Sequence, residues 1–205
     1  MIIIPEIETV VILVPRTGSG SLRRALRNRY EHAFMPYRHM EACGVPHGYD
    51  RWRKVGVLRD PVARLWSLYK YLKAFDCDPA PGYAEAMRAQ VDRPFEDWLL
   101  HNDAQFTMPY DPTHGGRIYP LYTVNHPIAE NRKSQQLYLR PDLGTMVLRY
   151  GDAAALRDVL DVETEHFQNA TDLTPPPALS AEAERYVARC FAWDIGMNRS
   201  LWARG

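Results

Sequence analysis

The sequence has few cysteines, no long apolar run and no cluster of residues with metal-ligand spacing. Its three cysteines, Cys43, Cys77 and Cys190, are odd in number and scattered. This pattern is untypical of a disulfide framework or a zinc site and indicates a reducing compartment. No apolar run approaches the roughly 18 residues that a membrane-spanning helix needs, and the first residues lack the basic region of a secretory signal. We therefore expect a cytoplasmic protein that uses no metal and has no membrane partner.

An excess of charge of either sign is also missing, because 25 Lys and Arg residues balance 25 Asp and Glu residues. This balance argues against a general nucleic-acid or membrane-surface binder. The basic residues are nevertheless dense around positions 23–29 and 51–54, which favours a small polyanionic ligand. With 205 residues, 46% of them hydrophobic, the chain can form one sizeable core and hardly two. We expect a single domain over residues 1–205, with a helical and loop insert at about 76–135.

A buried strand, a small polar loop and a helix follow one another near the N-terminus. The continuous apolar run at 10–14 predicts a strand buried on both faces, and Pro15 ends it because proline cannot donate to a sheet ladder. Helical spacing resumes at Leu22. This geometry points backbone N–H groups and a helix N-terminus at an anion. The candidate phosphate-binding residues are Arg16, Thr17, Gly18, Ser19, Gly20, Ser21 and Leu22.

Two interpretations of this loop are open. It is not a Walker A loop, because Ser21 follows Gly20 where that motif has a lysine. Glycine and serine are also common in ordinary turns between a strand and a helix. The loop alone therefore does not distinguish a phosphate site from a plain turn.

A second stretch, at residues 53–72, repeats the order of strand, polar break and helix. Residues 55–58 predict a short strand, and Pro61 is well placed as the first residue of a helix. Arg59 leaves the end of the strand, and Ser67 lies two turns into the helix. The Arg59 guanidinium and the Ser67 hydroxyl can bind a second phosphate. Alternatively, Arg59 pairs with Asp60 and Ser67 is an ordinary helix-surface residue.

Together the two stretches resemble the sulfotransferase superfamily, whose members use 3′-phosphoadenosine 5′-phosphosulfate (PAPS) as donor. The matching segments read P-R-T-G-S-G-S-L, from Pro15, and R-D-P-V-A-R-L-W-S-L-Y, from Arg59. Looser similarities to the carbohydrate-type branch occur at residues 134–139, 145–160, 166–173 and 179–194. The resemblance implies that the first loop holds the 5′-phosphosulfate, and that Arg59 and Ser67 hold the 3′-phosphate.

The resemblance also implies an activity, the transfer of a sulfuryl group from PAPS to a hydroxyl or amine of an acceptor such as a carbohydrate. Arg16 stands where the family usually has lysine, and a permanently charged arginine can stabilise the departing phosphate without donating a proton. A base must then accept the proton of the acceptor. His39, at the end of a predicted strand, is our choice because a neutral imidazole suits this role. His47 and Glu41 are the alternatives.

The coarse order of elements predicts an α/β protein. Strands are expected at 10–14, 33–37, 55–58 and 145–149, and helices at 61–75, 83–91, 95–100, 153–160 and 181–193, the last capped by Ser180. This order indicates a three-layer α/β/α arrangement with a small, mostly parallel sheet, and the resemblance makes it a P-loop-like nucleotide-binding fold. The long segment 106–127 either covers an acceptor pocket or packs its own aromatic side chains, which are Tyr110, Tyr119 and Tyr122, beside His114.

Two further functions compete with the sulfotransferase interpretation. One is a nucleotide-dependent kinase of related fold, which the absence of the Walker lysine disfavours. The other is a catalytically weak module that binds a nucleotide, which Arg16 in place of lysine favours. The sequence sets neither the acceptor nor the oligomeric state.

Overall fold

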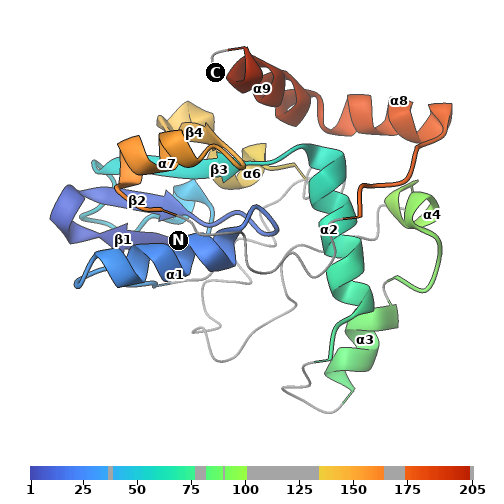
Figure 1. Ribbon diagram of the computed structural model, residues 1–205, viewed down its shortest axis with the longest axis horizontal. Helices are drawn as coiled ribbons and strands as arrows, with labels where there is room; N and C mark the ends of the chain where they lie inside the picture. The colour runs from blue at the N-terminus through green and yellow to red at the C-terminus, as the bar shows by residue number, and fades with distance from the viewer. Residues whose placement is uncertain (37–38, 77–81, 90, 101–133, 164–173, 204–205) are drawn as a thin grey trace. The chain divides into compact units, whose positions relative to one another are not determined.

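The computed structural model describes residues 1–36, 39–76, 82–89, 91–100, 134–163 and 174–203 (Figure 1). The chain divides into two compact units. The first comprises Met1–Asp60, Ser134–Thr174 and Trp193–Gly205, and the second comprises Pro61–Lys133 and Pro175–Ala192. Among the described helices, none is both long and apolar enough to cross a membrane.

The first unit is built on a four-stranded sheet with the order β1-β2-β3-β4. The strands are β1 (Ile2–Ile4), β2 (Thr9–Ile12), β3 (Arg53–Leu58) and β4 (Met146–Arg149). β1 is antiparallel to β2, whereas the pairs β2–β3 and β3–β4 are parallel. Parallel neighbours require a crossover through another element. The predicted α/β fold with a small, mostly parallel sheet is therefore confirmed.

One face of this sheet packs against two helices, α1 (Ser19–Arg29) and α7 (Ala153–Leu160). Alternate strand residues point to this face, and they form one buried cluster with apolar residues of both helices: Ile2, Ile4, Val11, Leu13, Val55, Val57 and Leu148 with Leu22, Leu26, Leu156 and Leu160. Residues three or four apart in each helix reach the cluster, as the 3.6-residue period requires. The helices thus lie on the same face of the sheet.

The opposite face is also buried, since Ile3, Val10 and Ile12 are at most 1% exposed. Here the short helix α6 (Gln136–Leu139) approaches β3 at Gly56. A Cβ built on Gly56 would overlap with the Leu139 side chain and touch Ile12. Glycine is therefore required at this strand position by the close approach of α6.

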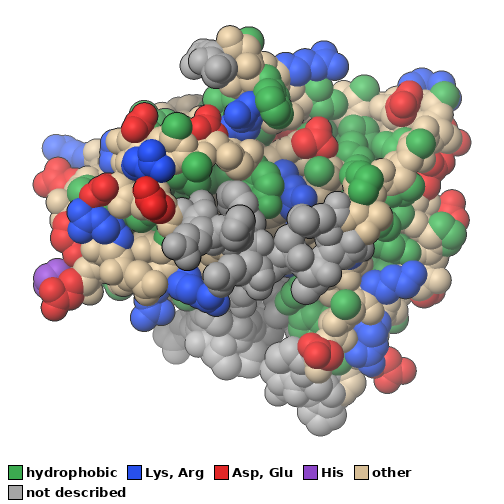
Figure 2. Space-filling view, viewed as in Figure 1, with side chains coloured by type: hydrophobic (Ala, Val, Ile, Leu, Met, Phe, Trp, Pro, Cys, Tyr) green, Lys and Arg blue, Asp and Glu red, His purple; other side chains and the backbone are tan. Residues whose placement is uncertain are grey.

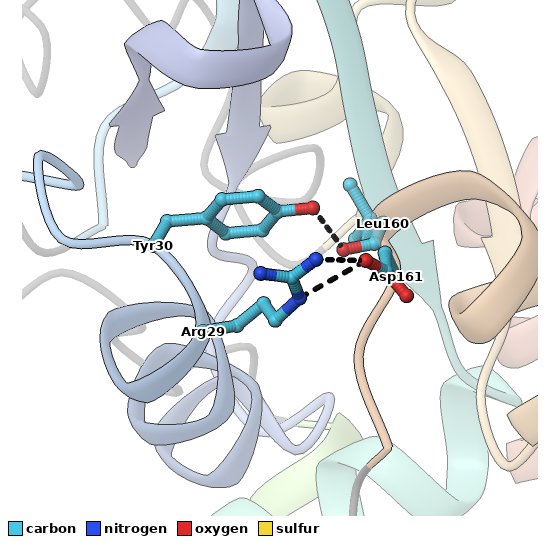
Figure 3. A network of polar contacts seen from close by, with 4 residues as sticks. All are labelled: Arg29, Tyr30, Leu160 and Asp161. Atoms are coloured by element: carbon cyan, nitrogen blue, oxygen red, sulfur yellow. Dashed lines mark hydrogen bonds and ion pairs between the residues drawn. The ribbon is translucent and has the colours of Figure 1, made fainter.

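Polar contacts tie the end of α1 to the end of α7 (Figure 3). The buried Tyr30 hydroxyl donates to the Leu160 carbonyl at 2.8 Å, and the Arg29 guanidinium pairs with the Asp161 carboxylate. Asp161 itself ends α7 in the left-handed conformation, with φ 49°. These contacts fix both helices over the sheet at the end opposite the loop that joins β2 to α1.

The second unit is helical. It contains α2 (Pro61–Lys73), α3 (Tyr83–Ala89), α4 (Phe95–Leu100) and α8 (Ala181–Cys190). Ring contacts among α2 and α4 centre on four aromatic residues, which are Trp66, Tyr69, Phe95 and Trp98. The Ser180 hydroxyl accepts a hydrogen bond from the Ala183 N–H, so the predicted cap of α8 is confirmed.

The remaining described elements are short or terminal. They are three 3₁₀ turns, η1 (Pro5–Ile7), η2 (Ala42–Gly44) and η5 (Pro141–Leu143), and the helix α9 (Ala192–Trp202). The single helix predicted at 181–193 was wrong in its extent. The chain leaves helical geometry at Phe191, with φ −121° and ψ 26°, and α9 then begins.

Two predictions about the strands were also wrong. β2 ends at Ile12, before the predicted end at Val14. No strand forms over the described part of 33–37, because Phe34 makes only an isolated bridge to Ile3 and is 41% exposed, and Pro36, two residues later, cannot donate. β1, which pairs with β2, was not predicted from the sequence. In addition, α1 begins at Ser19 rather than at Leu22, so Ser19, Gly20 and Ser21 belong to the helix.

Candidate functional site

The loop after β2 turns sharply within the residues before α1. Arg16 and Gly18 both have left-handed backbone conformations, with φ 65° and φ 73°. The buried Thr17 hydroxyl donates to the Val14 carbonyl at 2.9 Å and closes the turn. Gly18 is the N-cap of α1 and supplies no side-chain cap, and the backbone N–H groups at the N-terminus of α1 point towards this loop.

Arg59 lies directly against this loop. It follows the last residue of β3, and its Nη1 donates to the Arg16 carbonyl oxygen at 3.2 Å. Its guanidinium carbon sits 4.7 Å from the centroid of the Tyr150 ring. The structure therefore brings the predicted loop together with Arg59, the first residue of the second motif, at the carboxyl ends of β2 and β3, where ligands of α/β sheets gather.

The electrostatics of Arg59 suit an anion. Burial lowers the pKa of its guanidinium, against the opposing effects of Tyr150 and Asp60. Within the described residues, no carboxylate lies at ion-pair distance from Arg59, and the bond to Arg16 uses one of its five N–H donors. A partly dehydrated guanidinium with remaining donors gains from a phosphate oxygen placed against it.

The backbone of Arg59 is held by Gln135, which precedes α6. The Arg59 N–H donates to Gln135 Oε1 at 3.0 Å, and Gln135 Nε2 donates to the Arg59 carbonyl at 2.7 Å. Gln135 is in turn bound by Asp194 of α9, since its backbone N–H lies 3.1 Å from both carboxylate oxygens. The Ser134 hydroxyl donates to the same carboxylate at 2.8 Å. Gln135 and Asp194 are both 0% exposed.

His39 lies at the same end of β2. Its Nδ1 is 2.8 Å from the Leu13 carbonyl oxygen; since a carbonyl only accepts, Nδ1 carries a proton, and in a neutral ring Nε2 would be the nitrogen that accepts one. The alternatives differ in exposure, because Glu41 is 3% exposed whereas His47 is exposed. The hydrogen bond from Nδ1 ties His39 to Leu13, the residue that follows β2 and precedes the loop.

Ser67 lies on α2, in the second unit, whereas Arg59 belongs to the first. A shared role of Ser67 and Arg59 therefore stays a prediction. The aromatic segment 106–127 and the similarity at 166–173 lie outside the described residues. Over α1 and α7, Figure 2 shows acidic and basic side chains side by side, as expected for a balanced surface.

Gln135 and Asp194 were missed as site residues. The sequence analysis noted residues 134–139 and 179–194 only as loose similarities. Nothing in the local pattern indicates that a glutamine and an aspartate 59 positions apart contact one another and Arg59. The structure shows that the Asp194 carboxylate is buried. Such a group needs hydrogen-bond partners, and these partners lead to Gln135 and Arg59.

Comparison of the chain with family models, with curated proteins and with solved structures finds no significant match.

Proposed function

We propose that the protein is a PAPS-dependent sulfotransferase, which moves a sulfuryl group from the donor to a hydroxyl or amine of an acceptor such as a carbohydrate. In this proposal the loop from Arg16 to Ser21 and the N-terminus of α1 hold the 5′-phosphosulfate. Arg59 holds the 3′-phosphate, with Ser67 as its predicted partner. The sheet is then the core of a P-loop-like fold in a cytoplasmic, single-domain enzyme.

The observation that carries the proposal is the bond from Arg59 to the Arg16 carbonyl. Arg16 of the first motif and Arg59 of the second are 43 positions apart in the sequence, yet they are in contact. The loop that contains Arg16 leads into the N-terminus of α1, where backbone N–H groups favour an anion. Two cations and a helix N-terminus within one small region are suited to a ligand with two phosphate groups.

The chemistry follows from what sulfuryl transfer requires. The acceptor oxygen attacks sulfur in line, and the bond from sulfur to the bridging oxygen of the 5′-phosphate breaks. The electron pair leaves on that oxygen, where Arg16 can neutralise the charge. His39 Nε2 accepts the proton of the acceptor hydroxyl. Positioning and charge neutralisation supply most of the rate, as in phosphoryl transfer.

Calorimetric titration with adenosine 3′,5′-bisphosphate, the desulfated product, tests the proposal. The wild-type protein should bind the bisphosphate more tightly than ATP. Arg59→Ala should weaken binding of the bisphosphate by about 10- to 100-fold, since hydrogen bonds to charged groups contribute roughly 1.5–3 kcal/mol. Arg29→Ala is the matched control, because Arg29 pairs with Asp161 at the opposite end of α1. Tighter binding of ATP than of the bisphosphate would refute the proposal and favour the kinase.

A further inference from the structure

We propose that Gln135, held by Asp194, is a positioning residue that presents Arg59 to the 3′-phosphate of the donor. This inference rests on the proposed function, because it assigns Arg59 the same ligand. It concerns residues that the sequence motifs do not include.

The first step is that Arg59 lies beyond the sheet ladder. The register of β3 and β4 ends with the pair Leu58 and Arg149, and the next backbone bond runs from the Tyr150 N–H to the Leu58 carbonyl at 2.7 Å. The backbone N–H and carbonyl of Arg59 instead bind the Gln135 side chain, at 3.0 and 2.7 Å. Because the N–H can only donate and the carbonyl can only accept, this pairing also fixes the orientation of the amide.

The second step is that Gln135 has no freedom of its own. It is fully buried, its N–H donates to the Asp194 carboxylate, and its Nε2 lies 3.4 Å from Asp194 Oδ2. Ser134 adds a further donor to that carboxylate. A buried carboxylate needs hydrogen-bond partners, and this network supplies them from Ser134 and Gln135. It holds one side chain in place, and that side chain holds Arg59.

The third step connects the network to binding. A long, flexible arginine loses conformational entropy when it binds a phosphate. Arg59 is restrained at its backbone by Gln135 and at its guanidinium by Arg16 and the Tyr150 ring. Loss of Gln135 removes the restraint on the backbone, so Arg59 is held less firmly in the position that meets the phosphate. The expected consequence is a specific loss of affinity for the 3′-phosphate, with little effect on the 5′-phosphate.

The test measures 3′-phosphate selectivity, defined as the calorimetric Kd for adenosine 5′-monophosphate divided by the Kd for adenosine 3′,5′-bisphosphate. Gln135→Met keeps the volume of the side chain and removes both bonds to Arg59. We expect selectivity to fall by about tenfold, which corresponds to the net contribution of about one hydrogen bond. The Kd for the monophosphate should change by less than about twofold. Asp194→Asn, which keeps the shape and removes the charge, should shift selectivity in the same direction.

Tyr30→Phe is the matched control, because it also removes a buried hydrogen bond from the first unit but touches none of the residues around Arg59. It should lower Tm and leave the selectivity unchanged. A wild-type selectivity ratio in folded Gln135→Met and Asp194→Asn overturns the inference while the proposed function stands. Equal affinity of the wild-type protein for both nucleotides overturns the proposed function and this inference with it.

A measurement on the wild-type protein covers the case in which the variants do not fold. Amide hydrogen exchange at Arg59 should be slow, although the residue lies past the end of β3, because its N–H is bound to a buried side chain. Exchange of the Arg59 amide at the rate of an exposed loop would overturn the inference without any variant.

Discussion

The left-handed conformation of Arg16 makes a prediction about stability that can be tested without any ligand. At φ 65° a residue with a Cβ is strained by about 1–2 kcal/mol, whereas glycine is not. Glycine in turn loses about 0.5–1 kcal/mol through the entropy of its unfolded state. Arg16→Gly should therefore be more stable than Arg16→Ala by about 0.5–1 kcal/mol. For a chain of this length that corresponds to a Tm higher by about 1–4 °C.

The comparison is made between the two variants because both lack the guanidinium and all its contacts. Only the backbone preference at position 16 then differs. The assay is urea unfolding followed by circular dichroism, with Cm and m fitted for each variant. Gly18→Ala, at φ 73°, is the reverse experiment and should lose a similar amount. An Arg16→Ala variant as stable as Arg16→Gly would refute the reasoning, since it would mean that position 16 is not left-handed in solution.

Two further predictions concern the packing of the first unit. Burial raises the pKa of Tyr30, so its phenol remains protonated in the folded protein at a pH where it ionises in the unfolded chain. The free energy of unfolding should therefore decline as the pH rises above about 10. Denaturant titrations of Tyr30→Phe should lack the part of this decline that Tyr30 causes. At pH 7 the same substitution should lower the free energy of unfolding by about 1 kcal/mol. Gly56→Ala should destabilise by about 1–3 kcal/mol because its Cβ overlaps with Leu139. When Gly56→Ala is introduced into Leu139→Ala, its cost, measured from Cm values in a double-mutant cycle, should disappear. A cost that persists in the Leu139→Ala protein would contradict the close approach of α6.

Much of the sheet unit could be predicted from the sequence because its signals are local. The strands β2 and β3 are apolar runs because both faces of the sheet are buried. The helices α1 and α7 have apolar residues at helical spacing because one side of each helix packs on the sheet. Pro61 begins α2 as expected, since proline lacks the N–H that a first helical residue does not need.

The predictions were wrong where contacts between distant parts of the chain determine whether a segment forms a strand. The three isoleucines of β1 are too short a run to indicate a strand, and they become one by pairing with β2. Residues 33–37 have the composition of a strand, but Phe34 is left with a single bridge. The same holds for the site, because its motifs are local whereas Gln135 and Asp194 reach Arg59 from distant parts of the chain.

The central claim is that Arg59 and the loop at Arg16 bind one ligand with two phosphate groups. The most direct measurement is ³¹P nuclear magnetic resonance of adenosine 3′,5′-bisphosphate titrated with the protein. The account predicts that both phosphorus signals shift with the wild-type protein, and that in Arg59→Ala the 3′ signal alone returns towards its value in solution. A 3′ signal that does not respond to the wild-type protein, or that shifts equally in Arg59→Ala, would contradict it.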